Sequence, residues 1–238
     1  MSGDFRVPST DAGLVRAMQQ YYDRRAGEYD EWYLRAGPFE SAEDQQLWND
    51  ELAGVRAFLE AVKGNRVLEV ACGTGYWTRY LATGRRLVGL DFSPEMLVRA
   101  QARTDIGSAD LCRGDAYRLP FATGSFDAVV FAFWISHVPL GRLDAFLDEV
   151  HRVVRPGGQV ACVDGMRPTS NREPETVDAE RRVQGRRLRD GTEHSVVKVY
   201  YDEPTLRKCL TSRAEALEIA TTKRFFIMAR YRVRDPAR

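Results

Sequence analysis

The sequence predicts an α/β domain with a doubly wound, mostly parallel sheet, because segments typical of buried strands alternate with helical segments. Apolar runs such as 67–70 and 128–135 are typical of strands that are buried on both faces. Apolar residues recur at helical spacing in 43–62 and again in 143–154. Alternation of this kind leads to a parallel sheet with helices on both of its faces.

Length and composition indicate one ordinary globular domain over residues 1–238. The 35 Lys and Arg residues nearly balance 34 Asp and Glu residues, so the net charge of +1 gives no general reason to expect nucleic-acid binding. No apolar run approaches ~18 residues and the first ten residues lack the pattern of a signal peptide, so we expect a cytoplasmic protein without a membrane segment. The four cysteines and three histidines are scattered, and no metal is expected.

A glycine turn follows the first predicted strand and organises the chain. Strand 67–70 leads into the turn 73–75, where two glycines allow the backbone to pass close to a ligand. Glu69 is an acid on an apolar strand, where an unpaired charge would be costly, so we expect a cationic group near it. A dinucleotide fingerprint would need a third glycine where this chain has Thr78. A nucleoside-type cofactor is therefore expected across the turn.

The acid-x-x-x-Gly-x-Gly form of residues 69–75 resembles the first motif of the class I S-adenosylmethionine-dependent methyltransferases. The helix, Arg-Pro-Gly-Gly and strand passage at 143–164 resembles a late motif of the same family. The resemblance implies S-adenosylmethionine as cofactor and a Rossmann-like, seven-stranded, mostly parallel sheet with an antiparallel edge strand. The expected parts are an N-terminal lid (1–42), a cofactor-binding core (43–165), a substrate-side insert (166–201), and a closing helix with edge strands (202–238).

Two further acids follow predicted strands on the cofactor side. Asp91 ends the strand 86–91 beside the glycine turn, where a carboxylate can accept hydrogen bonds from ribose hydroxyls. Ser93 is expected to cap the next helix, so Asp91 is not needed for that role. By resemblance, Asp115 meets the adenine amino group. The complete set of residues assigned to the cofactor is Tyr29, Tyr33, Glu69, Ala71, Gly73, Thr74, Gly75, Asp91, Phe92, Met96, Asp115, Ala116 and Phe131.

The N-terminal segment around residues 21–33 is rich in tyrosine and tryptophan, interleaved with arginine. One interpretation is a helix that packs on the domain by its aromatic face. The segment also resembles the N-terminal lid of small-molecule methyltransferases, and the two interpretations are compatible. The resemblance implies that lid residues position the cofactor or line the acceptor site, for which the candidates are Tyr21, Tyr22, Trp32, Trp134 and His137.

His137 follows the central strand, where the carboxyl end of a parallel strand opens onto the ligand crevice. Imidazole is well matched to proton removal near neutral pH, so His137 is the candidate catalytic base; the alternative is a buried, hydrogen-bonded loop histidine. Methyltransferases that act on amino groups of nucleic-acid bases usually carry an Asn/Asp-Pro-Pro-aromatic motif at this place. The sequence 133–139 lacks that motif, which disfavours that branch.

Five arginines lie between residues 181 and 189. The run is typical of a solvated helix face, and the sharper interpretation is a site for an anionic acceptor. Beyond it, residues 194–201 are predicted as a strand, 203–210 as a helix, and 217–233 as two antiparallel edge strands split near 222–224.

The expected function is transfer of a methyl group to oxygen, nitrogen or carbon of a small molecule, such as a natural product or quinone-type metabolite. The acceptor pocket is expected where segments 21–33, 134–137 and 166–201 converge, in a monomer or a homodimer. Two alternatives remain: an RNA methyltransferase that uses the arginine run as a phosphate track, and a non-methylating scaffold or partner-binding protein that only binds the cofactor.

Overall fold

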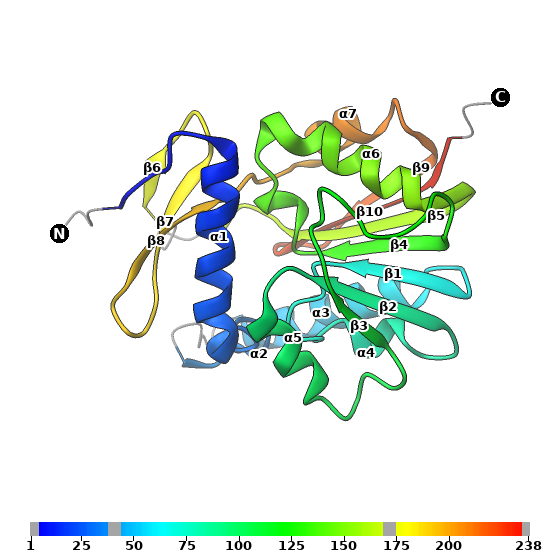
Figure 1. Cartoon of the computed structure of the whole chain (residues 1–238), viewed down its shortest axis with the longest axis horizontal. Coiled ribbons are helices and arrows are strands. Elements are labelled where there is room, and N and C mark those ends of the chain that lie inside the picture. The colour runs from blue at the N-terminus through cyan, green and yellow to red at the C-terminus, as the bar shows by residue number, and fades with distance from the viewer. Residues whose placement is uncertain (1–4, 38–43, 169–174, 235–238) are drawn as a thin grey trace.

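The computed structural model describes residues 5–37, 44–168 and 175–234. Within them, the main sheet has seven strands in the order β3-β2-β1-β4-β5-β10-β9 (Figure 1). The strands are β1 (Arg66–Val70), β2 (Arg86–Asp91), β3 (Asp110–Arg113), β4 (Phe126–Ala132), β5 (Val154–Gly165), β9 (Ala214–Thr221) and β10 (Phe226–Val233).

The strands from β3 to β5 are parallel, which confirms the predicted doubly wound sheet. Strand β10 runs antiparallel to both β5 and β9, so the antiparallel strand lies next to the edge strand β9. Central strands are buried on both faces: Val67, Leu68, Val129 and Val130 are each 0% exposed. This double burial explains why their sequences are continuously apolar rather than alternating.

Helices cover both faces of the sheet and produce two hydrophobic clusters. One cluster includes the apolar side of α6, and the other includes that of α3 and α4. The helical elements are α1 (Asp11–Arg25), η1 (Ala26–Glu28), α2 (Glu31–Leu34), α3 (Gln45–Glu60), α4 (Thr78–Leu81), α5 (Pro94–Gln101), η3 (Ile135–His137), η4 (Leu140–Arg142), α6 (Leu143–Val153) and α7 (Glu203–Leu210). The predicted cap of α5 is present, because the Ser93 hydroxyl accepts from the Met96 N–H at 3.1 Å.

The insert forms a second, antiparallel sheet of three strands, β6 (Thr176–Asp178), β7 (Val183–Arg187) and β8 (Glu193–Val197). Helix α1, drawn in blue, stands between this small sheet and the main sheet and packs against β8 (Figure 1). The N-terminal segment is also attached here: a Cβ on Gly185 would lie 2.5 Å from the Phe5 ring, so only glycine leaves room for that ring. The insert and α1 therefore form one wall beside the parallel strands.

The prediction of a helix face for the arginine run is wrong. Residues 183–187 are the central strand of the small sheet, and Val183, Gln184 and Gly185 are buried in succession. This central position satisfies the backbone on both sides, while the arginines reach outward from it or toward the lid. A local charge pattern does not reveal such non-local pairing.

Smaller differences concern the ends of elements. Helix α4 begins at Thr78. The Arg-Pro-Gly-Gly segment, expected between a helix and a strand, belongs to β5 itself, because Val154 already pairs with Phe126 before a register shift. The predicted boundary between lid and core, at residues 42 and 43, lies outside the described residues.

Candidate active site

A cavity lies at the carboxyl ends of the parallel strands. Its walls come from α1, from the segments that follow β1, β2 and β3, and from the residues after β4. The predicted cofactor residues on its wall are Tyr29, Ala71, Gly73, Asp91, Phe92, Met96, Asp115 and Ala116, and the predicted acceptor residues there are Tyr22, Trp134 and His137. Residues from all these segments therefore converge on one cavity.

The glycine turn has the backbone conformation that its sequence indicates. Gly73 and Gly75 have φ values of 56° and 77°, in the left-handed region that favours glycine. The Tyr29 ring covers the turn, since a Cβ on Gly73 would lie 3.7 Å from the Tyr29 Cε1. Ala71 and Phe133 also have positive φ, of 57° and 58°, which is strained for residues with a Cβ. Both line the cavity, so part of the backbone strain lies where a ligand would bind.

Asp91 is fixed by backbone donors. Its Oδ2 accepts from Gly73 N–H at 2.8 Å and its Oδ1 accepts from Ser93 N–H at 2.9 Å. Burial raises the pKa of Asp91 to about 6, while these N–H bonds oppose the rise. A carboxylate has about four acceptor positions, so Asp91 keeps the capacity to accept from ligand hydroxyls in the cavity.

Glu69 lies away from the cavity wall and is 2% exposed. The Thr78 hydroxyl donates to its Oε2 at 2.6 Å. Burial raises the pKa of Glu69 to about 8, as expected for a carboxyl group removed from water. The position that lacks the third glycine of a dinucleotide fingerprint therefore carries the hydrogen-bond partner of this acid.

Several predicted site residues are packed in the protein interior instead of on the cavity wall. Tyr33 stacks on Tyr76 with ring centroids 4.1 Å apart, and its carbonyl accepts from Trp48 Nε1. Trp32 packs edge to face among neighbouring rings, and Phe131 is 0% exposed. Tyr21, Glu69, Thr74 and Gly75 likewise do not line the cavity. The lid segment thus has both expected properties: some aromatics pack as core, while Tyr22 and Tyr29 face the ligand space.

His137 is held in one tautomer by two hydrogen bonds. Its Nδ1 lies 2.7 Å from the Val197 carbonyl, and its Nε2 lies 2.9 Å from the Tyr22 hydroxyl. Because a carbonyl oxygen only accepts, Nδ1 carries the proton and Nε2 accepts from Tyr22. Burial, followed by the charge of Lys198, lowers the pKa of His137 to about 3. The imidazole is therefore neutral, with its unprotonated nitrogen bonded to a lid residue.

A buried ion pair lies beside His137. Lys198 Nζ donates to Asp164 Oδ1 at 3.0 Å and to Ser136 Oγ at 2.7 Å, while Asp164 Oδ2 accepts from Ser136 N–H at 3.0 Å. The sequence interpretation missed both charged residues. Asp164 lies near the carboxyl end of β5, so the strand-end rule that selected Asp91 could have found it, whereas Lys198 has no local signal.

Two arginines of the run connect the insert to the lid. Arg189 pairs with Glu28 at 3.2 Å and Glu31 at 2.6 Å, and Arg181 pairs with Asp11 at 3.6 Å. Arg181 Nη1 also donates to the Pro8 carbonyl. The charges of these arginines are paired with carboxylates of the protein, which weakens the interpretation of the run as a phosphate track.

Arg186 acts on the acceptor side of the cavity. Its guanidinium donates to the neutral Gln184 side chain at 2.9 Å. Burial lowers the pKa of His137 and raises that of Tyr22, and the charge of Arg186 adds to the first shift and opposes the second. Its charge and that of Lys198 both act on His137, and the Asp164 carboxylate paired with Lys198 partly offsets them. Among the described residues, no group of three or more His, Cys, Asp or Glu side chains is arranged to hold a metal ion. No described helix is both long enough and apolar enough to cross a membrane.

The fold and the site define a doubly wound α/β protein that binds a nucleoside-type ligand at the carboxyl ends of its strands. Residues 67–158 match the family model described as a methyltransferase domain. The solved complex of DhpI with SAH is 30% identical and covers 94% of this chain and 99% of its own, with a TM-score of 0.74. The chain belongs to the class I S-adenosylmethionine-dependent methyltransferases.

Two further relatives extend the comparison. The complex described as DhpI-SAM-HEP is 31% identical, with a TM-score of 0.73 and coverage of 93% of this chain and 99% of its own. Demethylmenaquinone methyltransferase of Staphylococcus epidermidis (strain ATCC 35984 / DSM 28319 / BCRC 17069 / CCUG 31568 / BM 3577 / RP62A) is 39% identical over 142 residues. That match covers 58% of this chain and 57% of the relative, so the chain spans little more than half the length of this curated relative.

The cavity fits the cofactor of this family, S-adenosylmethionine. Asp91 retains acceptor capacity for hydroxyl groups, and the glycine turn leaves its backbone open to a ligand under the Tyr29 ring. Apolar side chains of Phe92 and Met96 line the same space beside Asp115. Polar acceptors and apolar surface thus occur together, as the binding of a nucleoside requires.

Proposed function

We propose that this protein transfers a methyl group from S-adenosylmethionine to an acidic hydroxyl of a small molecule. The proposal rests chiefly on one observation: a neutral, tautomerically fixed His137 lines the cofactor cavity and lies near the Lys198–Asp164 ion pair and the charge of Arg186. The acceptor is recognised by this combination of a hydrogen-bond acceptor and positive charge.

In the cofactor half, Asp91 would hold the ribose, and Asp115 with Ala116 the adenine. The turn that includes Gly73 would hold the methionine part, with Tyr29 above it. The bound cofactor supplies an activated methyl group on a sulfonium. The residues of this half bind, orient and exclude water, which is the main requirement for in-line transfer.

In the acceptor half, the Tyr22 hydroxyl occupies His137 Nε2, and an acceptor hydroxyl can take its place. A histidine with a pKa of about 3 is a weak base, so it removes a proton only from an acidic hydroxyl. The charge of Arg186 favours the anion that results, because opposite charges stabilise one another strongly in a buried site, whereas the charge of Lys198 is already paired with Asp164. The aromatic walls of Tyr22 and Trp134 suit a planar acceptor. The quinone-related name of the staphylococcal relative agrees with an acceptor of this kind.

Two observations favour a small molecule over RNA. The chain has a net charge of only +1, and Arg181 and Arg189 are engaged in ion pairs with the lid. The acceptor side of the cavity is covered by α1, which leaves a recess for a small group. We therefore do not propose nucleic acid as a partner.

The test combines turnover with cofactor binding. Purified protein and S-adenosylmethionine are incubated with a panel of phenols, quinols, aliphatic alcohols and amines, and SAH release is measured by mass spectrometry. We expect SAH release with acidic hydroxyl acceptors only, and its loss in His137→Ala. Turnover confined to amines, to RNA or to none of the panel in a protein that binds SAH would contradict the proposal.

Calorimetry of SAH binding isolates the cofactor half. Asp91→Ala removes charge-assisted hydrogen bonds and should weaken binding roughly 10-fold to 100-fold. Asp110→Ala is the matched control, since this exposed aspartate opens β3 and does not line the cavity. If the two substitutions weakened SAH binding equally, the assignment of Asp91 to the cofactor site would be wrong.

A further inference from the structure

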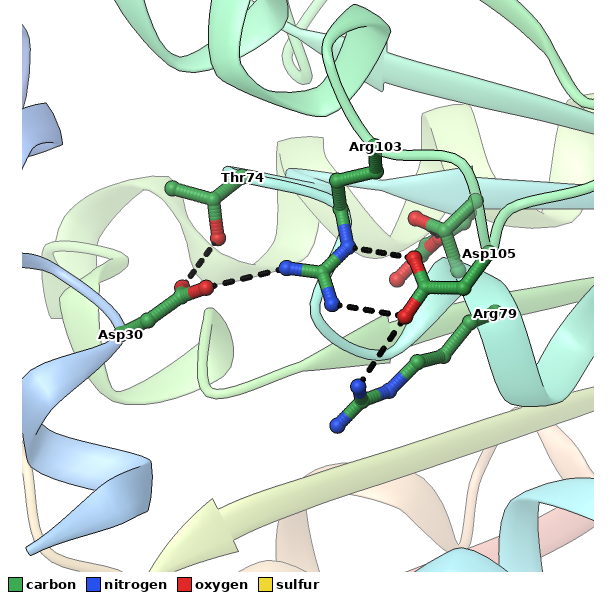
Figure 2. Close-up of polar contacts among 7 residues, drawn as sticks. Asp30, Thr74, Arg79, Arg103 and Asp105 are labelled. Atoms are coloured by element: carbon green, nitrogen blue, oxygen red, sulfur yellow. Dashed lines mark hydrogen bonds and ion pairs between the residues drawn. The ribbon is translucent and has the colours of Figure 1, made fainter.

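A polar cluster outside the cavity joins the lid to the glycine turn (Figure 2). Asp30, between η1 and α2, accepts a hydrogen bond from the Thr74 hydroxyl and pairs with Arg103 Nη1 at 3.0 Å. Arg103 directs its Nε and Nη2 to the two oxygens of Asp105, at 2.9 and 3.0 Å. Arg79 Nη1 donates to the same carboxylate at 3.1 Å. We call these five residues the Asp30 bridge.

The bridge is rigid on the side of the core. The two parallel bonds to Asp105 fix the plane of the Arg103 guanidinium and point its remaining nitrogen at Asp30. The Arg103 side chain is 18% exposed and that of Asp30 is 29% exposed, so water screens the pair only in part. The Arg103 Cδ also packs on the turn itself, 3.1 Å from where a Cβ on Gly75 would lie.

The bridge therefore contacts the glycine turn at two adjacent residues, Thr74 and Gly75. The Tyr29 ring covers the next residue of the turn, Gly73, and lines the cavity. Tyr29 and Asp30 are consecutive in the chain, so fixing Asp30 also restricts where the Tyr29 ring can move. Two consecutive lid residues, Tyr29 and Asp30, therefore both contact the glycine turn.

We propose that Asp30, held by Arg103 and Thr74, is a positioning residue that keeps Tyr29 over the glycine turn and thereby sets how long the cofactor product stays bound. This inference rests on the proposed function only in taking SAH as the ligand of the cavity. Loss of the bridge leaves the cavity residues that follow the strands in place but lets Tyr29 move away from the turn, so SAH leaves faster. The exposed ion pair between Arg56 and Glu60 has no such effect, because it lies within α3 and joins no ligand-covering segment to the site.

The main variant is Asp30→Asn, which keeps the shape of the side chain and removes its charge. Dissociation of radiolabelled SAH is followed after dilution into unlabelled SAH, together with the melting temperature of the ligand-free protein. We expect dissociation about 10-fold faster, because a charge-assisted contact is lost, with little change in the ligand-free melting temperature. Asp30→Glu, which keeps the charge, should restore a slower rate. The matched control is Glu60→Gln, which breaks the exposed pair with Arg56 and should leave the rate unchanged.

Arg103→Gln approaches the bridge from its other side and should give the same increase. In the double variant with Asp30→Asn the two effects should not add, because both remove one interaction. In turnover assays, Asp30→Asn should raise KM for S-adenosylmethionine about 10-fold and lower kcat less than about 2-fold, a split that general destabilisation would not produce.

The inference would be overturned if Asp30→Asn released SAH at the wild-type rate. It would also be overturned if SAH dissociated faster only to the extent that the ligand-free melting temperature is lowered. Either result leaves the proposed methyl transfer standing, since SAH still binds. Failure of the wild-type protein to bind SAH would instead overturn both.

Discussion

Replacing Lys198 with methionine tests the buried pair behind the acceptor site. The Lys198 side chain is 12% exposed and that of Asp164 is 2% exposed, at an Nζ to Oδ1 distance of 3.0 Å. Methionine matches the length of lysine but leaves the Asp164 carboxylate buried without its countercharge. Breaking one partner of a buried pair costs about 3 to 5 kcal/mol, and we expect Lys198→Met to lose stability in that range at pH 7.

The double variant Lys198→Met/Asp164→Asn separates the charge from the shape. Asparagine still offers an oxygen to the Ser136 N–H, which Asp164 Oδ2 accepts at 3.0 Å. No buried charge remains, so the double variant should regain most of the lost stability. The free energy of unfolding of all three proteins is measured by urea denaturation, and the three m-values should be equal. A loss below about 1 kcal/mol in Lys198→Met, or a double variant no more stable than the single one, would refute the reasoning.

The pH dependence of this loss has a definite sign. In the wild type, the countercharge of Lys198 keeps the pKa of Asp164 below its ordinary value against the effect of burial. The contribution of the pair is therefore complete above the unfolded pKa of about 3.9 and disappears as the pH falls through the folded pKa. Without Lys198, burial raises the pKa of Asp164, and the carboxyl group becomes neutral at mildly acidic pH. The deficit of Lys198→Met should accordingly shrink between pH 7 and pH 5.

Three further predictions concern single residues. Burial, followed by the charge of Arg213, lowers the pKa of His151 to about 4. The unfolded chain thus binds the extra proton first, and the contribution of His151 to wild-type stability should fall by up to about 3 kcal/mol below pH ~6.5, which predicts a weaker pH dependence in urea unfolding of His151→Gln. Gly73→Ala places a Cβ at a φ of 56° and should cost about 1 to 2 kcal/mol in unfolding while weakening SAH binding in calorimetry; full wild-type stability would show that the turn relaxes. Tyr22→Phe removes the donor to His137 Nε2 and should lower KM for the acceptor, because the acceptor no longer displaces a hydroxyl; a raised KM would mean that Tyr22 itself binds the acceptor.

The parallel sheet and the positions of the strand-end acids could be predicted because local patterns encode them. The continuous apolar character of β1 and β4 follows from burial on both faces, and the positive φ of Gly73 follows from the sharp turn after β1. Asp91 directly ends β2 and bonds the backbone of that turn at 2.8 Å. Each of these relations joins residues near one another in the chain or at equivalent ends of adjacent strands.

Aromatic residues of the lid could not be assigned individually from their sequence. Tyr29 covers the glycine turn, whereas Tyr33, four residues later, stacks on Tyr76 in the core. Both side chains have the same ring and the same hydroxyl, and their roles differ only by the direction in which the short segment between them turns. The prediction of a helix for the arginine run was wrong for a related reason, because the pairing of β7 depends on the strands on both sides of it.

The acceptor half resists prediction because its chemistry arises from distant segments. His137 obtains its tautomer from the Val197 carbonyl, its hydrogen-bond donor from Tyr22 and its lowered pKa in part from Lys198. The sequence separations are 60 residues for Val197 and 115 for Tyr22, so no local motif can record the arrangement. The position of His137 after a strand indicates only where the residue lies in the fold. The insert and the lid set its protonation state, and its protonation state sets how acidic an acceptor must be. These are the two parts in which the family resemblance is weakest.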